Sequence, residues 1–163
     1  MADLTAAVLT VSDRAARGDY EDLSGPAAEA ALRLLGFDVV ATRVVPDGVD
    51  SVARAVTELA ALAGLVVTTG GTGMSARDLT PEGTMKVIER EAPGLSEAMR
   101  ASTFGRVPYG MLSRGISGIV GRTLVVNLPG SVRGVEEGLD VIGPALGHAV
   151  ELLVGPGSDH HSP

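Results

Sequence analysis

The chain has 163 residues and a formal net charge of −7. A chain of this length fits one domain, and its 45% apolar residues supply a mainly aliphatic core, because aromatic residues make up only 2%. Binding to duplex nucleic acid is not expected, because it needs clustered Lys and Arg and this chain has a single lysine, Lys86. The absence of cysteine excludes disulfides, thiolate metal sites and cysteine nucleophiles.

The first residues, Met1-Ala2-Asp3, lack the basic stretch of a signal peptide and lead directly into an apolar run. No apolar run in the sequence has the length of a membrane span. We therefore expect a cytoplasmic protein with no membrane partner.

In chain order, the first half alternates strands with helices. Strands are predicted over 6–11, 38–45 and 65–69, where branched aliphatic residues follow one another. Apolar residues at helical spacing predict helices over 26–35 and 51–62. This alternation is typical of a parallel sheet.

The next predicted helix runs from Thr80 to Ala92. Thr80 is a good N-cap, Pro81 and Glu82 suit a first turn, and Pro93 interrupts the pattern. A further helix is expected over 95–102.

Two short apolar segments, 118–120 and 123–128, flank a turn and predict a hairpin, so that one strand of the sheet is antiparallel. Ser131 is expected to cap a helix through Asp140, and Pro144 to start a last helix that ends near Val154. Together these elements predict one α/β domain over 1–155. The polar tail 156–163 is predicted to be disordered.

Polar or glycine-rich residues follow every buried strand. In an open α/β sheet, ligands bind beyond the carboxyl ends of the strands, so these residues are expected to share a site. They are Ser12-Asp13-Arg14 with the loop to Ser24, then Pro46-Asp47-Gly48, the turn Gly70-Gly71-Thr72-Gly73, and Asn127 to Ser131.

The glycine turn, residues 70–73, can be interpreted in two ways. Glycines allow positive φ values and close approach of a ligand, and exposed amides can hold an oxyanion. A strand-to-helix turn with a purely structural role would look the same. The turn is neither a P-loop nor a GxGxxG dinucleotide fingerprint.

Asp47 and Asp78 are candidate magnesium ligands, because Mg²⁺ favours one or two carboxylates together with substrate phosphates and water. The alternatives are that Pro46-Asp47-Gly48 is only a turn, and that Arg77-Asp78 is a surface ion pair or a turn before the helix. Likewise, Ser12-Asp13 can form an Asx turn or contact a ligand.

Six motifs follow one another along the chain: Thr10-Val11-Ser12-Asp13-Arg14, Asp22-Leu23-Ser24-Gly25-Pro26, Pro46-Asp47, Thr68 to Gly73, Arg77 to Glu82 and Asn127 to Ser131. The segment TTGGTG followed by RDLTPE is the most specific of them. In order and spacing, from about residue 4 to residue 155, these motifs resemble the MoaB/Mog family of molybdenum-cofactor biosynthesis.

The resemblance implies a three-layer α/β/α fold that assembles as a homotrimer or hexamer. It also implies magnesium-dependent transfer of AMP from ATP to the terminal phosphate of molybdopterin, which is a substrate here, and delivery of the product to a molybdate-insertion enzyme. Asp47 and Asp78 match the family's essential aspartates. The residues expected to bind substrate or phosphate are Ser12, Asp13, Ser24, Gly70, Gly71, Thr72, Gly73, Thr80, Pro81, Glu82, Asn127, Pro129, Gly130 and Ser131.

The chain departs from the family pattern at Val132, where members commonly have proline. Two competing hypotheses stand beside the adenylyltransferase. One is a non-catalytic paralogue that binds molybdopterin without turnover. The other is an interaction module on a generic α/β fold, in which the glycine turn is only structural.

Overall fold

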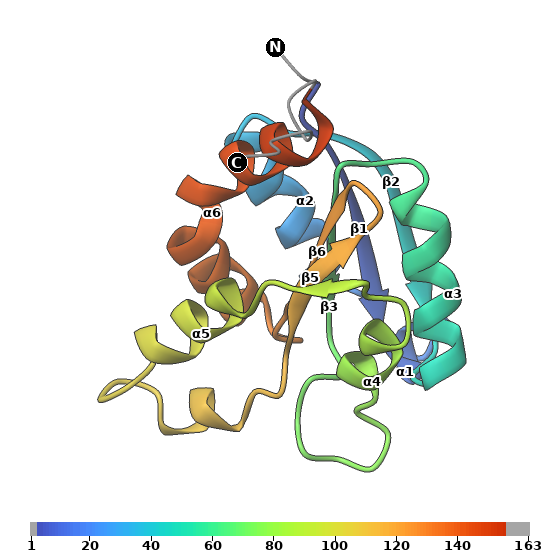
Figure 1. The fold of residues 1–163 in the computed structure, drawn as a ribbon. Coiled ribbons are helices and arrows are strands. Elements are labelled where there is room, and N and C mark those ends of the chain that lie inside the picture. Colours follow the sequence, from blue (N-terminus) through green and yellow to red (C-terminus); the bar gives the residue numbers. More distant parts are fainter. Residues whose placement is uncertain (1–2, 156–163) are drawn as a thin grey trace.

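The computed structural model describes residues 3–155, whose strands form one six-stranded sheet (Figure 1). The strand order is β2-β1-β3-β6-β5-β4, and β5 alone runs antiparallel to its neighbours. The predicted mostly parallel sheet with one antiparallel strand is therefore confirmed. The strands are β1 (Thr5–Val11), β2 (Asp38–Val45), β3 (Leu65–Thr69), β4 (Arg90–Glu91), β5 (Ser117–Val120) and β6 (Thr123–Leu128).

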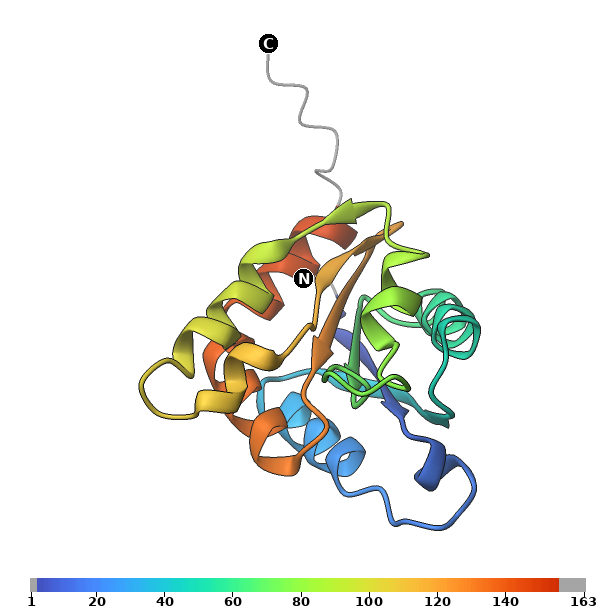
Figure 2. The same cartoon turned by 90° about the horizontal axis from the view of Figure 1, so that it is seen from below.

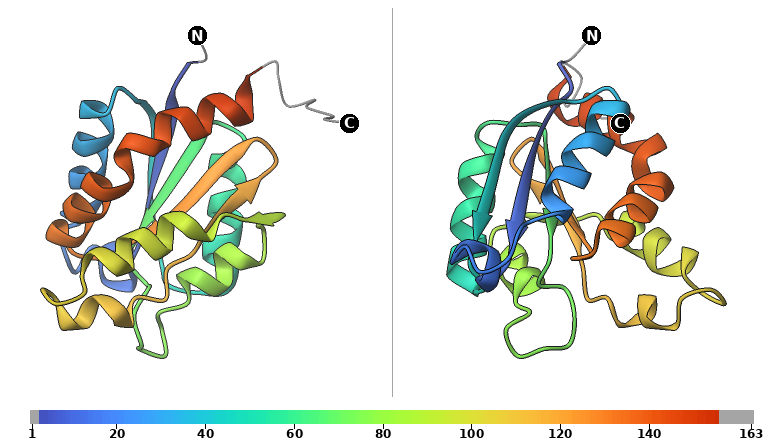
Figure 3. Two further views of the ribbon diagram at one scale, coloured as in Figure 1. Left: turned by 60° about the vertical axis from the view of Figure 1, so that its left-hand side comes forward. Right: turned by 180° about the vertical axis from the view of Figure 1, so that it is seen from behind.

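Helices cover both faces of this sheet, which confirms the three-layer α/β/α architecture (Figures 1 and 3). Helices α2, α5 and α6 pack on one face, and α3 and α4 lie on the other. The helices are α1 (Asp13–Ala16), α2 (Ser24–Leu34), α3 (Val49–Ala60), α4 (Thr80–Met85), α5 (Pro93–Ser102) and α6 (Val132–Val154), with a 3-10 helix η1 (Pro108–Leu112).

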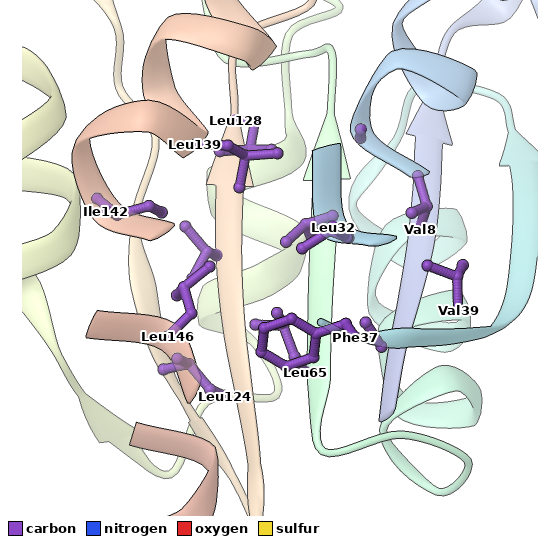
Figure 4. Packing of buried hydrophobic residues seen from close by; sticks show 14 of the residues in the cluster. Val8, Leu32, Phe37, Val39, Leu65, Leu124, Leu128, Leu139, Ile142 and Leu146 are labelled. Carbon is purple, nitrogen blue, oxygen red and sulfur yellow. The ribbon is translucent and has the colours of Figure 1, made fainter. Parts of the chain in front are cut away.

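The aliphatic composition explains why these layers adhere. Every residue of β3 and β6 is buried, as expected of strands that are covered on both faces. The larger half of the core lies between the sheet and α2 and α6, where Leu32, Leu65 and Leu146 are fully buried (Figure 4). On the other face, Val52, Val56 and Leu59 form the apolar stripe of α3.

The helix predicted over 80–92 is wrong beyond its first turns. Helix α4 ends at Met85, and the chain then turns into β4, which pairs with β5. The amide of Glu89 donates to the carbonyl of Ile119, so pairing at the sheet edge replaces the helical pattern.

The two helices predicted after Ser131 are one. Helix α6 continues from Val132 to Val154 with Pro144 inside it. An interior proline costs a helix about 3 kcal/mol. Buried residues on both sides of Pro144, among them Leu139 and Leu146, keep one stripe packed on the sheet and offset this cost.

The carboxyl ends of β1, β2, β3 and β6 meet at one edge of the sheet, at the bottom of Figure 1, and Figure 2 views the molecule from this end. Helix α6 ends at the opposite end (Figure 3). The tail 156–163, predicted to be disordered, lies outside the described residues. Within residues 3–155, no helix has both the length and the apolar composition needed to cross a membrane.

Candidate active site

The strand ends surround a polar pocket of about 240 Å³. It brings together both candidate catalytic aspartates, Asp47 and Asp78, as the sequence predicted. The residues that line this polar pocket are Thr10, Val11, Ser12, Ala15, Tyr20, Asp22, Ser24, Asp47, Thr69, Gly70, Gly71, Asp78 and Gly130.

Asp47 is held by a reciprocal contact with Asp13. The amide of Asp13 donates to Oδ2 of Asp47 over 2.9 Å, and the amide of Asp47 donates to Oδ1 of Asp13 over 3.1 Å. Arg77 completes the cluster, because its guanidinium donates to both oxygens of Asp13 and to the carbonyl of Asp47. The carboxylate of Asp13 is thus engaged by protein groups, while Oδ1 of Asp47 faces the glycine turn.

The three carboxylates and Arg77 set the charge of this cluster. Burial raises the pKa of Asp47, and the negative charges of Asp13 and Asp78 raise it further. The hydrogen bond from Arg77 lowers the pKa of Asp13. The ionised form of Asp47 is therefore destabilised by its surroundings, and a cation beside it would stabilise that form.

The glycine turn takes the left-handed conformation at its first two residues, with φ of 93° at Gly70 and 66° at Gly71. A Cβ on Gly71 would lie 2.2 Å from Oγ1 of Thr80 and 3.0 Å from Oδ1 of Asp47. Among the described residues, the amides of Gly71, Thr72 and Gly73 donate to no protein group. Three amides are therefore available to an anion.

Thr80 has a different role from the predicted N-cap. The cap position is Leu79, which makes no side-chain cap bond. The hydroxyl of Thr80 donates to the carbonyl of Gly70 over 2.9 Å, and its amide donates to the carbonyl of Gly71. Thr80 therefore holds the backbone of the glycine turn through the carbonyls of Gly70 and Gly71.

Asp78 lies on the other side of the glycine turn from Asp47. Its Oδ2 accepts from the amide of Ser75 over 2.9 Å, and a Cβ on Gly73 would lie 2.9 Å from the same oxygen. The two aspartates thus flank the turn, one close to Gly71 and one close to Gly73.

A larger apolar cavity of about 420 Å³ draws on the same two segments as the polar pocket, 70–73 and 129–131. Thr72, Gly73, Pro129 and Ser131 line the apolar cavity, and Gly70, Gly71 and Gly130 line the polar pocket. Helix α5, η1 and the start of α6 form the other sides of the apolar cavity. The residues that line this apolar cavity include Thr72, Gly73, Met74, Met99, Tyr109, Asn127, Pro129, Ser131 and Glu137.

Asn127 borders the apolar cavity, but its side chain is engaged within the protein. Its Nδ2 donates to the hydroxyls of Thr68 and Thr84, and its Oδ1 accepts from the amide of Ile116. The side chain is buried, so Asn127 joins the sheet to α4.

The loop after β6 forms the wall between the two spaces. Thr69 donates to the carbonyl of Pro129, and a Cβ on Gly130 would lie 3.2 Å from Cα of Gly70. Ser131 caps α6 as predicted, because its Oγ accepts from the amide of Gly134. Val132 begins the helix, so the cap forms without the proline common in the family.

Four of the predicted site residues line neither space. They are Asp13, paired with Arg77; Thr80, bonded to the glycine turn; Pro81, buried in α4; and Glu82, paired with Arg114. Ser12 and Ser24 line the polar pocket, where Ser12 caps α1 through the amide of Ala15.

Two features of the site were not predicted from the sequence. The apolar cavity comes from residues spread between 72 and 138, and the side chain of Arg114 contacts groups 32 to 41 residues away along the chain. Neither the cavity nor the Arg114 contacts are marked by a local sequence motif. A Ser-Arg-Gly stretch after an irregular segment was the only signal at Arg114.

No group of three or more His, Cys, Asp or Glu within residues 3–155 is arranged to hold a metal ion. Asp47 and Asp78 both line the polar pocket, and two carboxylates fit a magnesium ion that also needs phosphate oxygens and water to complete its ligands.

The family model described as a probable molybdopterin binding domain matches residues 7–148. A molybdopterin adenylyltransferase of Helicobacter pylori strain J99 is 40% identical, with 91% of this chain and 86% of that protein covered. The molybdopterin biosynthesis enzyme MoaB of Thermus thermophilus superposes with a TM-score of 0.88 at 40% identity, covering 93% and 97% of the two chains. A tungsten cofactor synthesizing protein MoaB of Pyrococcus furiosus gives 0.83 at 36% identity, covering 91% and 95%. The chain therefore belongs to this molybdopterin-binding family, the MoaB/Mog family.

Proposed function

We propose that this protein is a molybdopterin adenylyltransferase, which transfers AMP from ATP to the terminal phosphate of molybdopterin and releases pyrophosphate. The observation that carries the proposal is the position of Asp47 and Asp78 on either side of a turn with three available amides. Relatives named for this activity support it.

Protein groups take little part in the making and breaking of bonds in this reaction. A phosphate oxygen of molybdopterin attacks the α-phosphorus of ATP, and a new P–O bond forms. The bond from the α-phosphorus to the bridging oxygen breaks, and its electron pair leaves on pyrophosphate. The attacking phosphate is largely ionised at pH 7, so no general base is needed. Positioning and charge stabilisation supply the catalysis.

The residues present match these two tasks. The amides of 71–73 would hold phosphate oxygens without adding cationic side chains, which suits an acidic protein that binds two polyanions. Magnesium, held by Asp47 and Asp78, would neutralise charge on the phosphates. The apolar cavity, with Tyr109 and Met99 in its wall, would accept a planar ring beside the phosphates.

Three further expectations belong to the same proposal. They are an assembly of three or six copies, release of the adenylylated product to a molybdate-insertion enzyme, and action in the cytoplasm. Each stays a prediction.

The test is release of pyrophosphate from MgATP in the presence of molybdopterin, with Asp47→Asn and Asp78→Asn beside the wild type. Asp38→Asn is the matched control, because Asp38 is an exposed carboxylate at the start of β2, away from the site. We expect both site variants to lose turnover by at least about 100-fold while binding molybdopterin, and the control to match the wild type.

The same assay separates the enzyme from a binding-only paralogue. Wild-type turnover no higher than that of Asp78→Asn, with molybdopterin still bound, would identify a non-catalytic protein. Failure of the wild type to bind molybdopterin at all would favour the interaction module.

A further inference from the structure

Arg114 lies between η1 and β5, and it contacts the loop between β3 and α4 at several points. Its Nε donates to the carbonyl of Gly73 over 2.8 Å, and its Nη2 donates to the carbonyl of Asp78. Its Nη1 pairs with the carboxylate of Glu82. Its backbone amide donates to the carbonyl of Thr72 over 2.8 Å. Arg114 thus binds both ends of the loop and the first turn of α4.

The loop has few other anchors, and residues 74–77 are exposed. The amide of Asp78 donates to the carbonyl of Ser75, and the amide of Ser75 donates to Oδ2 of Asp78. These bonds shape the turn around Asp78 but do not attach it to the sheet. The side chain of Arg77 reaches the ends of β1 and β2, whereas the backbone carbonyl of Asp78 is held by Arg114.

The two neighbours of Arg114 in the chain are themselves held by hydrogen bonds from α5. Arg100 of α5 donates from Nη1 to the carbonyl of Gly115 over 2.7 Å and to that of Ser113 over 3.4 Å. The segment that carries Arg114 is therefore fixed to α5. The hydrogen bond from Arg114 also lowers the pKa of Glu82, so that both groups stay charged near pH 7.

We propose that Arg114 is a positioning residue for adenylyl transfer, which holds the loop 72–78 so that the carboxylate of Asp78 stays in the polar pocket with Asp47. The inference rests on the proposed function for its catalytic meaning. Arg114 acts through backbone carbonyls, and its guanidinium nitrogens are occupied by the loop and Glu82.

The test compares Arg114→Ala and Arg114→Lys with Arg122→Ala. Arg122 is a matched control, because its guanidinium also donates to backbone carbonyls, those of Leu153, Val154 and Gly155. It lies in the β5–β6 turn, at the other end of the sheet from the site. Thermal unfolding of each variant establishes that it is folded. Arg114→Lys keeps the positive charge but lacks the forked guanidinium that spans two carbonyls. It replaces Arg114→Ala in the test if the alanine variant does not fold.

We expect kcat for pyrophosphate release to fall about 10- to 100-fold in Arg114→Ala, because a small displacement of a catalytic group is enough for such a loss. The magnesium concentration for half-maximal rate rises, and the Kd for molybdopterin without ATP stays within about 3-fold of wild type. Added guanidinium ion, at millimolar concentration, restores part of kcat in Arg114→Ala and none in Asp78→Asn. A merely structural role would not produce that rescue.

The double variant Arg114→Ala/Asp78→Asn gives a further check. If Arg114 acts through Asp78, the double variant is no slower than Asp78→Asn alone. Arg114→Ala with wild-type kcat and magnesium response would overturn the inference, and so would full additivity in the double variant.

The two proposals fail in different ways. A wild type that releases no pyrophosphate sinks the proposed function. Hydrogen exchange then decides the positioning of the loop. Faster exchange of the Asp78 amide in Arg114→Ala than in Arg122→Ala supports the role of Arg114, and equal exchange in the two overturns it.

Discussion

The backbone amides of Asp13 and Asp47 each donate a hydrogen bond to the carboxylate of the other. Asp13 follows β1 and Asp47 follows β2, so the pair joins the ends of two neighbouring parallel strands. Arg77, from the loop after β3, closes the cluster. Asp47 is consequently fixed by contacts from three strand ends.

Replacing Asp13 should weaken catalysis through the position of Asp47. In Asp13→Ala, the amide of Asp47 loses its acceptor and Arg77 loses its partner. We expect kcat for pyrophosphate release to fall about 10- to 100-fold. Asp19→Ala, which removes another surface partner of an arginine, should leave kcat unchanged. An Asp13→Ala enzyme at full rate would mean that Asp47 keeps its place without the reciprocal bond.

Asp47→Asn should make the protein more stable at pH 7 while abolishing turnover. Burial, together with repulsion from Asp13 and Asp78, raises the pKa of Asp47, so the folded state resists ionisation of this group. Wild-type stability therefore falls as pH rises from the ordinary Asp pKa through the raised one, because the unfolded chain releases the proton first. The side-chain amide oxygen of the variant would still accept from the amide of Asp13.

Thermal unfolding at several pH values measures this difference. The Asp47→Asn advantage should be largest at pH 7 and vanish as the pH falls below the ordinary Asp pKa of about 3.9, where the carboxyl is protonated in both the folded and the unfolded wild type. A variant that unfolds below the wild type at pH 7 would contradict the prediction.

Gly71→Ala should disrupt the glycine turn, and Gly121→Ala provides the control. Both glycines have a left-handed φ, 66° and 57°. A Cβ on Gly121 meets nothing within 4 Å, whereas one on Gly71 meets Oγ1 of Thr80 at 2.2 Å. We expect about 1 kcal/mol of destabilisation for Gly121→Ala from φ alone, and about 2–4 kcal/mol for Gly71→Ala.

Urea unfolding compares the two alanine variants. Gly71→Ala should also lose turnover, because the shifted turn no longer presents its amides. Equal destabilisation of the two variants would show that the side chain of Thr80 moves away from the new Cβ without a penalty in free energy.

Asn127→Ala should destabilise the fold more than it weakens any ligand. The substitution leaves the hydroxyls of Thr68 and Thr84 and the amide of Ile116 without their partner in the interior. Each of these three groups costs about 1–3 kcal/mol, so we expect a loss of at least about 3 kcal/mol in the free energy of unfolding. The cap variant Ser131→Ala should lose only about 1 kcal/mol. A stable Asn127→Ala protein with selectively lost molybdopterin binding would instead assign Asn127 to the ligand.

The strands were the most predictable part of this fold. The expected spans of β2, β3 and β6 agree with the structure. Strands β3 and β6 are buried on both faces and are therefore continuous runs of mostly branched aliphatic residues, whereas β2 is an edge strand that its Val-rich sequence marks. Helix ends were less predictable. Pairing of β4 with β5 overrides helical periodicity after Met85, and packing on the sheet carries α6 through Pro144.

The polar pocket was predictable for a related reason. Side chains that follow parallel strands must meet at one edge, so the positions of Asp47, Asp78 and the glycine turn follow from the topology. The sequence could not tell which polar side chains face the pocket and which support it. Asn127 supports the sheet, and Arg114 binds carbonyls, which every residue possesses and no pattern marks.

Residues 70–73 and 129–131 lie between the polar pocket and the apolar cavity, which are otherwise lined by different parts of the chain. Except for Gly130, the polar pocket is built by residues 10–78, whereas the apolar cavity draws on α5, η1 and the start of α6. Under the proposed function, substitutions in these later elements would change which ring the cavity accepts while the phosphate chemistry stays intact. The two spaces are built by separate parts of the chain, so under the same proposal ring specificity could evolve without changes at Asp47 and Asp78.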